Sequence, residues 1–327
     1  MAFVNAQQAA IDSGTAVEPS KLTVAELMRL WLDALDVRVT TREGYERLTR
    51  NHIVPRVGAV LVQQLAPATL QAMYNAMRTE GVGARTIQLC HMRLTQALAM
   101  AVEQDLVQRN PATRVKRPRA DTKDMKVWSA EQARQFLAVA AVECPYGPLW
   151  LLALATGLRR GELLGLRWQD VDIDGGALTV RQILNETEAG LTFGPPKTRA
   201  SQRVVLLYPD VVAALRNHKA QQHAEGVSPK LVFTGKTGGA VFPNNLQRHY
   251  ERLVQLAGVP RINIHGLRHT YATLALSSGA PIKAVSETMG HVRASITLDV
   301  YTHALAGQHA EVASKVGGLL LRADALT

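Results

Sequence analysis

Hydrophobic residues in the first third of the chain recur at the spacing of amphipathic helices. Thr23 opens the segment TVAELMRLWLDAL, and Glu26 follows three residues later, which is the pattern of a capping box ahead of an apolar stripe. Asn110-Pro111 ends the region, because the residue before a proline rarely continues a helix. We predict an all-helical domain over 21–110, after a flexible tail over 1–20. Its other predicted helices are Thr41–Asn51, Pro67–Thr79 and Ala84–Glu103.

A second stretch of helical pattern begins at Ser129, where Gln132 completes another capping box. The segment PLWLLALATGL is apolar on every side, so it predicts a buried helix, which Gly157 ends. A short helix, GELLGL, comes directly after it. From Pro209 the chain is helical again, in four or five short pieces that run to near Gly317.

Between these helices the pattern changes to the alternation of β-strands. Asp174-Gly175-Gly176 interrupts VDIDGGALTVRQIL, which predicts a hairpin turn. LTF and RVVLL, on either side of GPPKTRASQ, are candidates for a third and a fourth strand. The domain over 127–327 is therefore predicted to be mostly helical with one small antiparallel sheet. The fold class of the whole chain is mainly α with a small antiparallel β-sheet, in two domains.

The segment over 111–126 separates the two domains and holds the densest basic cluster of the chain. Pro111 and Pro118 predict an extended interdomain linker with a basic surface. The cluster includes Arg114, Lys116, Arg117 and Arg119.

Composition narrows the classes of function. The chain has 327 residues, enough for about two domains, and 37 Lys and Arg against 27 Asp and Glu give a formal charge of +10. This charge favours a polyanionic partner. The longest apolar stretch, 148–158, is too short to span a membrane, and the N-terminus shows no secretory signal pattern. Two cysteines are too few for a disulfide scaffold, a cysteine zinc site or an iron–sulfur cluster, so we predict a cytoplasmic protein.

Two charged residues stand where packing alone does not explain them. Arg159 follows a buried helix directly, so its charge is partly desolvated unless it meets an anion. Pairing with Glu162 or Asp170 is the structural alternative. Lys197 lies in a predicted turn between strands, where a lysine is ordinarily solvated.

Two further segments, HGLRH and GHVRASITLDVYTH, carry histidines and a tyrosine. His265 and His269 have the spacing of a zinc pair on a helix, but Arg268 beside them disfavours a metal cation. His291 and Tyr301 lie in the second segment, where a tyrosine on a short amphipathic helix is ordinarily a core residue.

As a set, these residues suit phosphoryl transfer without a metal. Two guanidinium groups can hold the non-bridging oxygens of a phosphodiester and match the charge of its pentavalent transition state. A tyrosine, with an ordinary pKa of about 10, becomes a nucleophile beside positive groups or a base, and a lysine can protonate the departing 5′ oxygen. The clustered carboxylates that a metal-dependent nuclease needs are not found in the sequence.

The ordered motifs ATGLRRGELLGLRW, PPKTRASQR, HGLRHTYAT and MGHVRASITLDVYTH resemble the tyrosine recombinase (phage integrase) family. The spacing matches along 127–305, and the region over 21–110 is similar to the family's core-DNA-binding domain. By this resemblance, Arg159 and Arg268 would clamp the phosphate, with Glu162 orienting neighbouring groups. The other implied roles are Lys197 as general acid, His265 in proton transfer, His291 as hydrogen-bond donor to the phosphate, and Tyr301 as nucleophile.

The resemblance also implies a reaction and partners. Tyr301 would attack a phosphodiester of double-stranded DNA, giving a 3′-phosphotyrosyl link and a free 5′ hydroxyl, without metal, ATP or any other cofactor. Family members close on DNA as a C-shaped clamp and exchange strands through a Holliday junction in a homotetramer. The free protein is expected to be a monomer or weak oligomer, encoded by a bacterium, a phage or another mobile element, with an accessory directionality factor as a further candidate partner. The basic linker, with Arg114, Lys116, Arg117 and Arg119, would contact the DNA backbone.

Some features depart from the family pattern or leave alternatives open. Position 266, often Asp in the family, is Gly266, which is expected to alter helix capping. The tail over 1–20 is too short for the arm-binding domain of many phage integrases. The apolar patch over 316–321 would either cover its own core or dock on a neighbouring subunit.

Two other functions are alternatives. A type IB topoisomerase relaxes DNA as a monomer with a similar set of residues, and a non-catalytic DNA-binding module would keep the fold without the reaction. The presence of all six site residues favours the recombinase.

Overall fold

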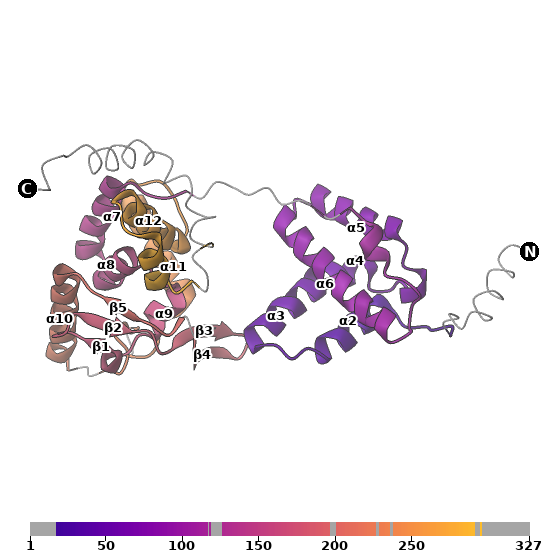
Figure 1. Cartoon of the computed structure of the whole chain (residues 1–327), viewed down its shortest axis with the longest axis horizontal. Helices are drawn as coiled ribbons and strands as arrows, with labels where there is room; N and C mark the ends of the chain where they lie inside the picture. Colours follow the sequence, from indigo (N-terminus) through magenta and orange to yellow (C-terminus); the bar gives the residue numbers. More distant parts are fainter. Residues whose placement is uncertain are drawn as a thin grey trace, which may run out of the picture. The chain divides into compact units, whose positions relative to one another are not determined.

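The protein is described here by a computed structural model, which forms two compact units, residues 1–123 and residues 124–327 (Figure 1). The structure describes residues 18–116, 118, 126–196, 201–226, 229–235, 238–291 and 295. Across these residues we find no helix long and apolar enough to cross a membrane.

The first unit is built from helices joined by short turns. Both hydrogen bonds of the predicted capping box are present: Glu26 N–H donates to Thr23 Oγ1 (3.3 Å), and Thr23 N–H donates to Glu26 Oε2 (2.8 Å). The prediction of a helix starting here is therefore confirmed. The helices are α2 (Val24–Asp33), α3 (Val39–Leu48), a π-helical turn (Thr49–Ile53) leading into α4 (Val54–Val57), α5 (Pro67–Thr79) and α6 (Ala84–Glu103), with 3₁₀ turns at Val62–Gln64 and Pro111–Arg114.

The core of the first unit reaches beyond residue 110, into the segment predicted as linker. Ala112 and Val115 are buried in the same cluster as the apolar faces of α2, α5 and α6. Asn110 fixes this turn, because its side chain accepts a hydrogen bond from the N–H of Ala112 and donates to Thr95 O on α6, both at 2.9 Å. The chain therefore stays packed on the helical unit until at least Val115.

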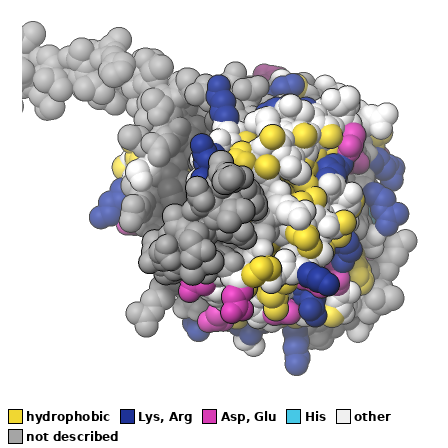
Figure 2. Space-filling view, turned by 90° about the vertical axis from the view of Figure 1, so that its right-hand side faces the viewer, with side chains coloured by type: hydrophobic (Ala, Val, Ile, Leu, Met, Phe, Trp, Pro, Cys, Tyr) yellow, Lys and Arg dark blue, Asp and Glu magenta, His cyan; other side chains and the backbone are white. Residues whose placement is uncertain are grey.

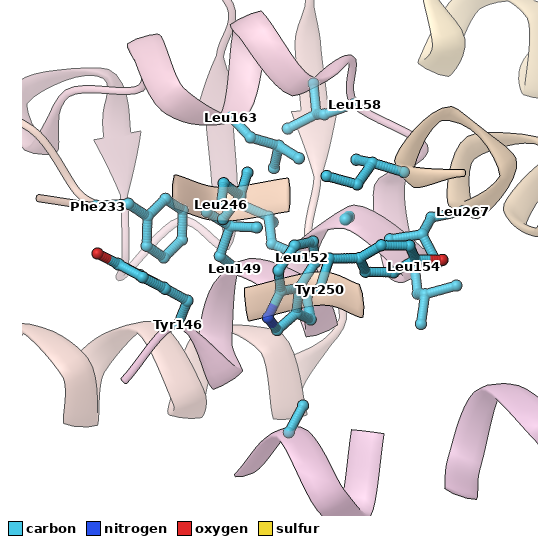
Figure 3. Packing of buried hydrophobic residues seen from close by; sticks show 14 of the residues in the cluster. Tyr146, Leu149, Leu152, Leu154, Leu158, Leu163, Phe233, Leu246, Tyr250 and Leu267 are labelled. Carbon is cyan, nitrogen blue, oxygen red and sulfur yellow. The ribbon is translucent and has the colours of Figure 1, made fainter. Parts of the chain in front are cut away.

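The second unit is organised around the buried helix that its apolar sequence predicts. This helix is α8 (Gly147–Thr156), and its side chains meet those of the surrounding helices in one hydrophobic core (Figure 3). Aromatic rings fill the centre, where Trp150 and Tyr250 lie with ring centroids 5.3 Å apart. The other helices are α7 (Ala130–Glu143), α9 (Arg160–Gly165), α10 (Pro209–Ala224), α11 (Pro243–Leu256), α12 (Ile264–Ser277) and α13 (Ile282–Met289).

The strands form two small antiparallel sheets in the described part of the chain, where one was predicted. Strands β1 (Val171–Asp172) and β2 (Ala177–Thr179) make the predicted hairpin, and β5 (Val204–Leu206) pairs with the other edge of β2. Strands β3 (Ile183–Thr187) and β4 (Gly190–Gly194) form a separate hairpin. The mainly helical fold class with antiparallel strands is confirmed, while the single sheet is corrected to two.

The two strands flanking the PPKTRASQR motif therefore belong to different sheets. β4 ends at Gly194 and pairs with β3, whereas β5 starts at Val204 and pairs with β2. Lys197 lies between them, outside the described residues.

Candidate functional site

The turn between α8 and α9 places the first arginine. Gly157 ends α8 in the left-handed region, with φ of 62°, and a Cβ at this position would lie 2.5 Å from the ring of Tyr271. A glycine therefore satisfies both the backbone conformation and the close packing. Two residues later, Arg159 occupies the position just before α9.

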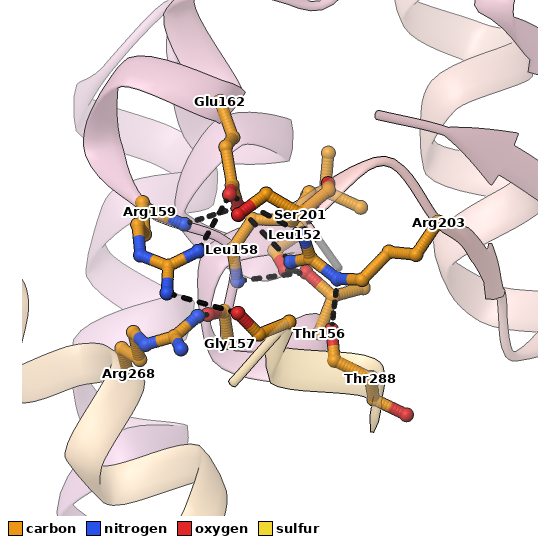
Figure 4. Close-up of polar contacts among 11 residues, drawn as sticks. Leu152, Thr156, Gly157, Leu158, Arg159, Glu162, Ser201, Arg203, Arg268 and Thr288 are labelled. Atoms are coloured by element: carbon orange, nitrogen blue, oxygen red, sulfur yellow. Dashed lines mark hydrogen bonds and ion pairs between the residues drawn. The ribbon is translucent and has the colours of Figure 1, made fainter. Parts of the chain in front are cut away.

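Glu162, on the first turn of α9, holds Arg159 in place. Its carboxylate accepts hydrogen bonds from the backbone N–H of Arg159 (3.0 Å) and from Arg159 Nη1 (2.9 Å) (Figure 4). Of the two pairings considered for Arg159, the one with Glu162 is confirmed. Asp170 instead binds Arg167 and Arg181.

The second arginine comes from α12 and meets the same turn. Asn263 caps this helix by accepting a hydrogen bond from the N–H of Gly266 (2.8 Å), so the cap is at Asn263. Arg268, one turn into α12, is buried and donates from Nη1 to Gly157 O at 2.6 Å. Arg159 and Arg268 therefore approach each other at the Gly157 turn (Figure 4).

His291 reaches this place through the turn that follows α13. Gly290 ends that helix in the left-handed region, with φ of 66°, and the N–H of His291 donates to Ser286 O at 3.0 Å. Arg159 Nη2 donates to Gly290 O at 3.2 Å, which ties the turn to the first arginine. The residue pair Gly290-His291 is thus anchored beside Arg159.

The surroundings lower the pKa of each of the three histidines of the site, which favours the neutral imidazole. Burial, followed by the charges of Arg268 and Arg159, lowers the pKa of His265. Burial, followed by neighbouring positive groups, lowers the pKa of His269 and of His291 to about 4. The rings of His265 and His269 lie edge to face, with centroids 4.8 Å apart. Neutral imidazoles of this kind can donate or accept a hydrogen bond without adding charge.

Arg203, at the end of the PPKTRASQR motif, joins the site without having been predicted. Its Nη1 and Nη2 donate to the two carboxylate oxygens of Glu162 at 3.2 and 3.0 Å, and its Nε donates to Thr288 O at 2.5 Å (Figure 4). Nothing in its local sequence marks it, because an arginine just before a strand ordinarily faces solvent. Only the folded arrangement shows that its side chain is buried.

The charge of this cluster favours an anion. Arg159 and Arg203 pair with the carboxylate of Glu162, whereas Arg268 donates to the carbonyl of Gly157. Among these four described residues, three positive charges therefore stand against one negative charge. The side chain of Arg159 is 38% exposed, which leaves part of its guanidinium open to a ligand. A phosphate group matches both the charge and the forked donors.

The structure brings together five of the residues predicted from the sequence and leaves others undescribed. Arg159, Glu162, His265, Arg268 and His291 form one cluster, since the charges of Arg159 and Arg268 act on both histidines. Lys197, Tyr301, Arg117 and Arg119 lie outside the described residues, and so does the C-terminal patch over 316–321. Arg114 and Lys116 are exposed on the first unit.

Comparison with known proteins identifies the family. The sequence profile of the phage integrase family matches residues 126–308, more than half of the chain. The chain belongs to the phage integrase family. The profile of the phage integrase N-terminal SAM-like domain matches residues 23–78, within the first unit.

Two relatives match this chain over most of its length. It is 29% identical to the "Tyrosine recombinase XerC-like" protein of Caldanaerobacter subterraneus, over 95% of this chain and 87% of that protein. It is also 29% identical to the integrase of Mycobacterium phage L5, over 86% of this chain and 75% of the relative. Enzymes of this family cleave and rejoin DNA strands at specific sites, so the recombinase is a tyrosine site-specific recombinase of the integrase type.

Solved structures confirm the fold of the recombinase. The Tn1549 transposon integrase in complex with a circular intermediate DNA matches with a TM-score of 0.79 and 22% identity, over 91% of this chain and 99% of that one. A lambda integrase tetramer bound to a Holliday junction matches with a TM-score of 0.65 and 17% identity, over 88% of this chain and 81% of that one.

Proposed function

We propose that the recombinase cuts and rejoins double-stranded DNA with Tyr301 as its nucleophile and the Arg159–Arg268 cluster as its phosphate site. The convergence of these two arginines on the Gly157 turn carries the proposal. Buried arginines retain their charge, and a cluster with surplus positive charge stabilises the extra negative charge of a pentavalent phosphorane.

In the first step, the Tyr301 oxygen attacks phosphorus and the bond from phosphorus to the 5′ oxygen breaks. The tyrosine proton passes to His265, and Lys197 gives a proton to the departing 5′ oxygen. A 5′ hydroxyl of the partner duplex then attacks the phosphotyrosyl link and releases Tyr301. The phosphoester bond is conserved throughout, so the reaction requires no cofactor.

The histidines act on this centre as neutral groups. His265 lies on the first turn of α12 with a lowered pKa, which suits an imidazole that accepts a proton only during the reaction. His291 is fixed by its backbone next to Arg159 and is suited to donate a hydrogen bond to a phosphate oxygen. Glu162 orients the guanidinium of Arg159 from the protein side.

The DNA partner is supported by charge and by the relatives. Both basic and acidic side chains lie on the face shown in Figure 2, and the whole chain carries a formal charge of +10. The solved Tn1549 and lambda integrases are bound to DNA, the latter as a tetramer on a Holliday junction. We propose the same substrate and a homotetramer on DNA, with a directionality factor as a further partner. We propose that the helical domain over 21–110, the basic segment over 111–126 and the catalytic domain over 127–327 all contact the duplex.

The test is covalent capture of DNA. The full chain is incubated in EDTA with a randomised pool of nicked duplexes, and denaturing gels are examined for protein–DNA adducts. We expect adducts with the wild type and none with Tyr301→Phe, and sequencing of the captured DNA then gives the target site. Binding without adducts would make the chain a non-catalytic module, and cleavage that requires added magnesium would contradict the mechanism. Relaxation of plasmids that lack the captured site would indicate a topoisomerase.

A further inference from the structure

Arg203 occupies a central position in the site, and four of its five side-chain N–H groups donate to protein acceptors. Its side chain is 8% exposed, and the Glu162 side chain that it binds is 1% exposed. Four hydrogen bonds to Glu162, Ser201 and Thr288 occupy its guanidinium from several sides. An arginine whose donors are bound in this way orients the protein groups that accept its hydrogen bonds.

These neighbours belong to two parts of the catalytic cluster. Arg203 binds both carboxylate oxygens of Glu162, and the same carboxylate orients the guanidinium of Arg159. Through Thr288 O, it binds the last turn of α13, two residues before Gly290. A Cβ on Gly290 would lie 2.7 Å from Arg203 Nη1, so the guanidinium packs directly against the turn that carries His291.

We infer that Arg203 is a positioning residue for the strand-transfer reaction, which sets Arg159 through Glu162 and sets His291 through the end of α13. The inference rests on the proposed function, because it assigns Arg203 to the residues proposed to hold the phosphate. Arg203 comes three residues after the undescribed segment 197–200 and belongs to the described part of the PPKTRASQR motif.

The ionisation of Glu162 agrees with this arrangement. Burial alone would raise the pKa of the carboxyl group, but the hydrogen bonds and charge of Arg203, and then those of Arg159, hold that pKa below its ordinary value of 4.5. Without Arg203, the buried carboxylate would keep only Arg159 as its ionic partner, and Arg159 would be drawn further toward it. The phosphate-facing edge of Arg159 would then move.

The protein contains a matched control for this ion pair. Asp170 is also a buried carboxylate between two arginines, Arg167 three residues before it and the more distant Arg181. In the described part of the chain, these partners bind none of the site residues. Arg167→Met therefore removes a comparable ion pair away from the catalytic cluster.

The experiment separates catalysis from DNA binding. A nicked duplex with the sequence captured by the wild type is the substrate, and single-turnover adduct formation is measured at saturating protein beside the Kd for DNA and the Tm. We expect Arg203→Met to slow adduct formation by about 100-fold, the effect of a misplacement of about 1 Å, while Kd changes by less than about threefold. Arg167→Met should retain the wild-type rate constant even if its Tm falls by a similar amount.

Two further variants keep the inference testable if Arg203→Met does not fold. Arg203→Lys keeps the charge, but one ammonium group cannot bind both Glu162 oxygens and Thr288 O in parallel, so we expect at least about a tenfold loss of rate. The rate of adduct formation in the double variant Arg203→Met/Glu162→Gln should fall no further than in the more affected single variant. The reason is that Arg203 is inferred to orient Arg159 through Glu162, so both substitutions disturb the same contact.

Each contrary result has a distinct meaning. A wild-type rate constant in a folded Arg203 variant, or a weaker Kd that explains the whole loss, overturns the positioning role. Additive losses in the double variant would overturn the route through Glu162. If the wild type itself forms no adduct with the randomised pool, the proposed function fails, and that failure is seen before any variant is made.

Discussion

At the residue scale, the site combines arginines that stay charged with histidines that stay neutral. Arg159 and Arg268 supply positive charge, and the same charge, after burial, lowers the pKa of His265 and His291. A neutral imidazole beside two guanidinium groups can accept and donate protons, and in its neutral form it does not repel the two positive charges. The chemistry of each residue type was evident from the sequence, but these ionisation states follow from burial and proximity.

The lowered histidine pKa values predict a loss of stability in acid. His269 has a pKa of about 4 in the folded protein against 6.5 ordinarily, so the unfolded chain binds more protons between these values and stability falls as pH decreases from 6.5 to 4. His269→Gln should reduce this loss by about 1–2 kcal/mol, once solvent screening of the half-buried ring is allowed for. Urea unfolding at pH 7 and pH 5, followed by tryptophan fluorescence, measures the change.

The control is His223→Gln, at an exposed position near the end of α10. It should leave the difference in unfolding free energy between the two pH values unchanged. Equal pH dependence in the wild type and His269→Gln would show that the half-buried ring does not remain neutral.

At the element scale, the turn between α8 and α9 positions the two arginines proposed to hold the phosphate. α8 ends at Gly157, whose carbonyl accepts the hydrogen bond of Arg268, and Arg159 follows two residues later. The end of α8 at this glycine was correctly predicted from the sequence, because an apolar run followed by glycine is a common helix C-terminus. The ring of Tyr271 against the glycine comes from α12 and could not be predicted.

Gly157→Ala should damage both stability and catalysis. The substitution places a side chain at φ of 62° and 2.5 Å from the ring of Tyr271. The left-handed backbone alone costs about 1–2 kcal/mol, and displacing the ring adds about 1–3 kcal/mol. Adduct formation should fall more than tenfold, since the carbonyl that anchors Arg268 moves.

Gly258→Ala is the matched control, because Gly258 has φ of 63° with nothing within 4 Å of the added Cβ. We expect only the backbone cost and wild-type adduct formation. If the two variants had the same free energy of unfolding and the same rate, close packing at Gly157 would have no role.

The β-strands show where local pattern stops being sufficient. The hairpin at 171–179 was predicted from its Asp-Gly-Gly turn and is confirmed. The candidate strands LTF and RVVLL are confirmed as β4 and β5, but the pairing of β4 with β3 was missed, and β5 was not assigned to the edge of β2. Strands of three to five residues carry too little alternation to specify a partner, and pairing is decided by the surfaces on which they pack.

At the scale of the whole molecule, surplus positive charge should dominate binding to DNA. Each phosphate contact by Lys or Arg releases counterions, and the slope of log K against log salt is about −0.9 for each contact. The double variant Arg114→Gln/Lys116→Gln, at exposed positions, should make the slope less steep by roughly 2. Fluorescence anisotropy with labelled duplex across a range of salt concentrations measures it.

Arg216→Gln provides the control, because Arg216 already pairs with Asp174 at 3.3 Å. This variant should retain the wild-type slope. A slope that does not change in the double variant would remove these two residues from the DNA interface.

The sequence by itself determined the local elements, the family and most of the chemical groups. Capping boxes at Thr23 and Ser129, the apolar run of α8 and the glycine that ends it are encoded by neighbouring residues, and short-range hydrogen bonds and burial suffice to realise them. The order of motifs identified Arg159, Glu162, His265, Arg268 and His291 as a set.

Only the tertiary structure decided how these groups meet. Arg203 and Glu162 are 41 residues apart, and Arg159 and Gly290 are 131 apart, yet each pair is joined by hydrogen bonds. The same holds for the two separate sheets and for the extension of the first core to Val115. Such contacts depend on packing between elements that are distant in sequence, and no local pattern records which buried side chain will find which partner.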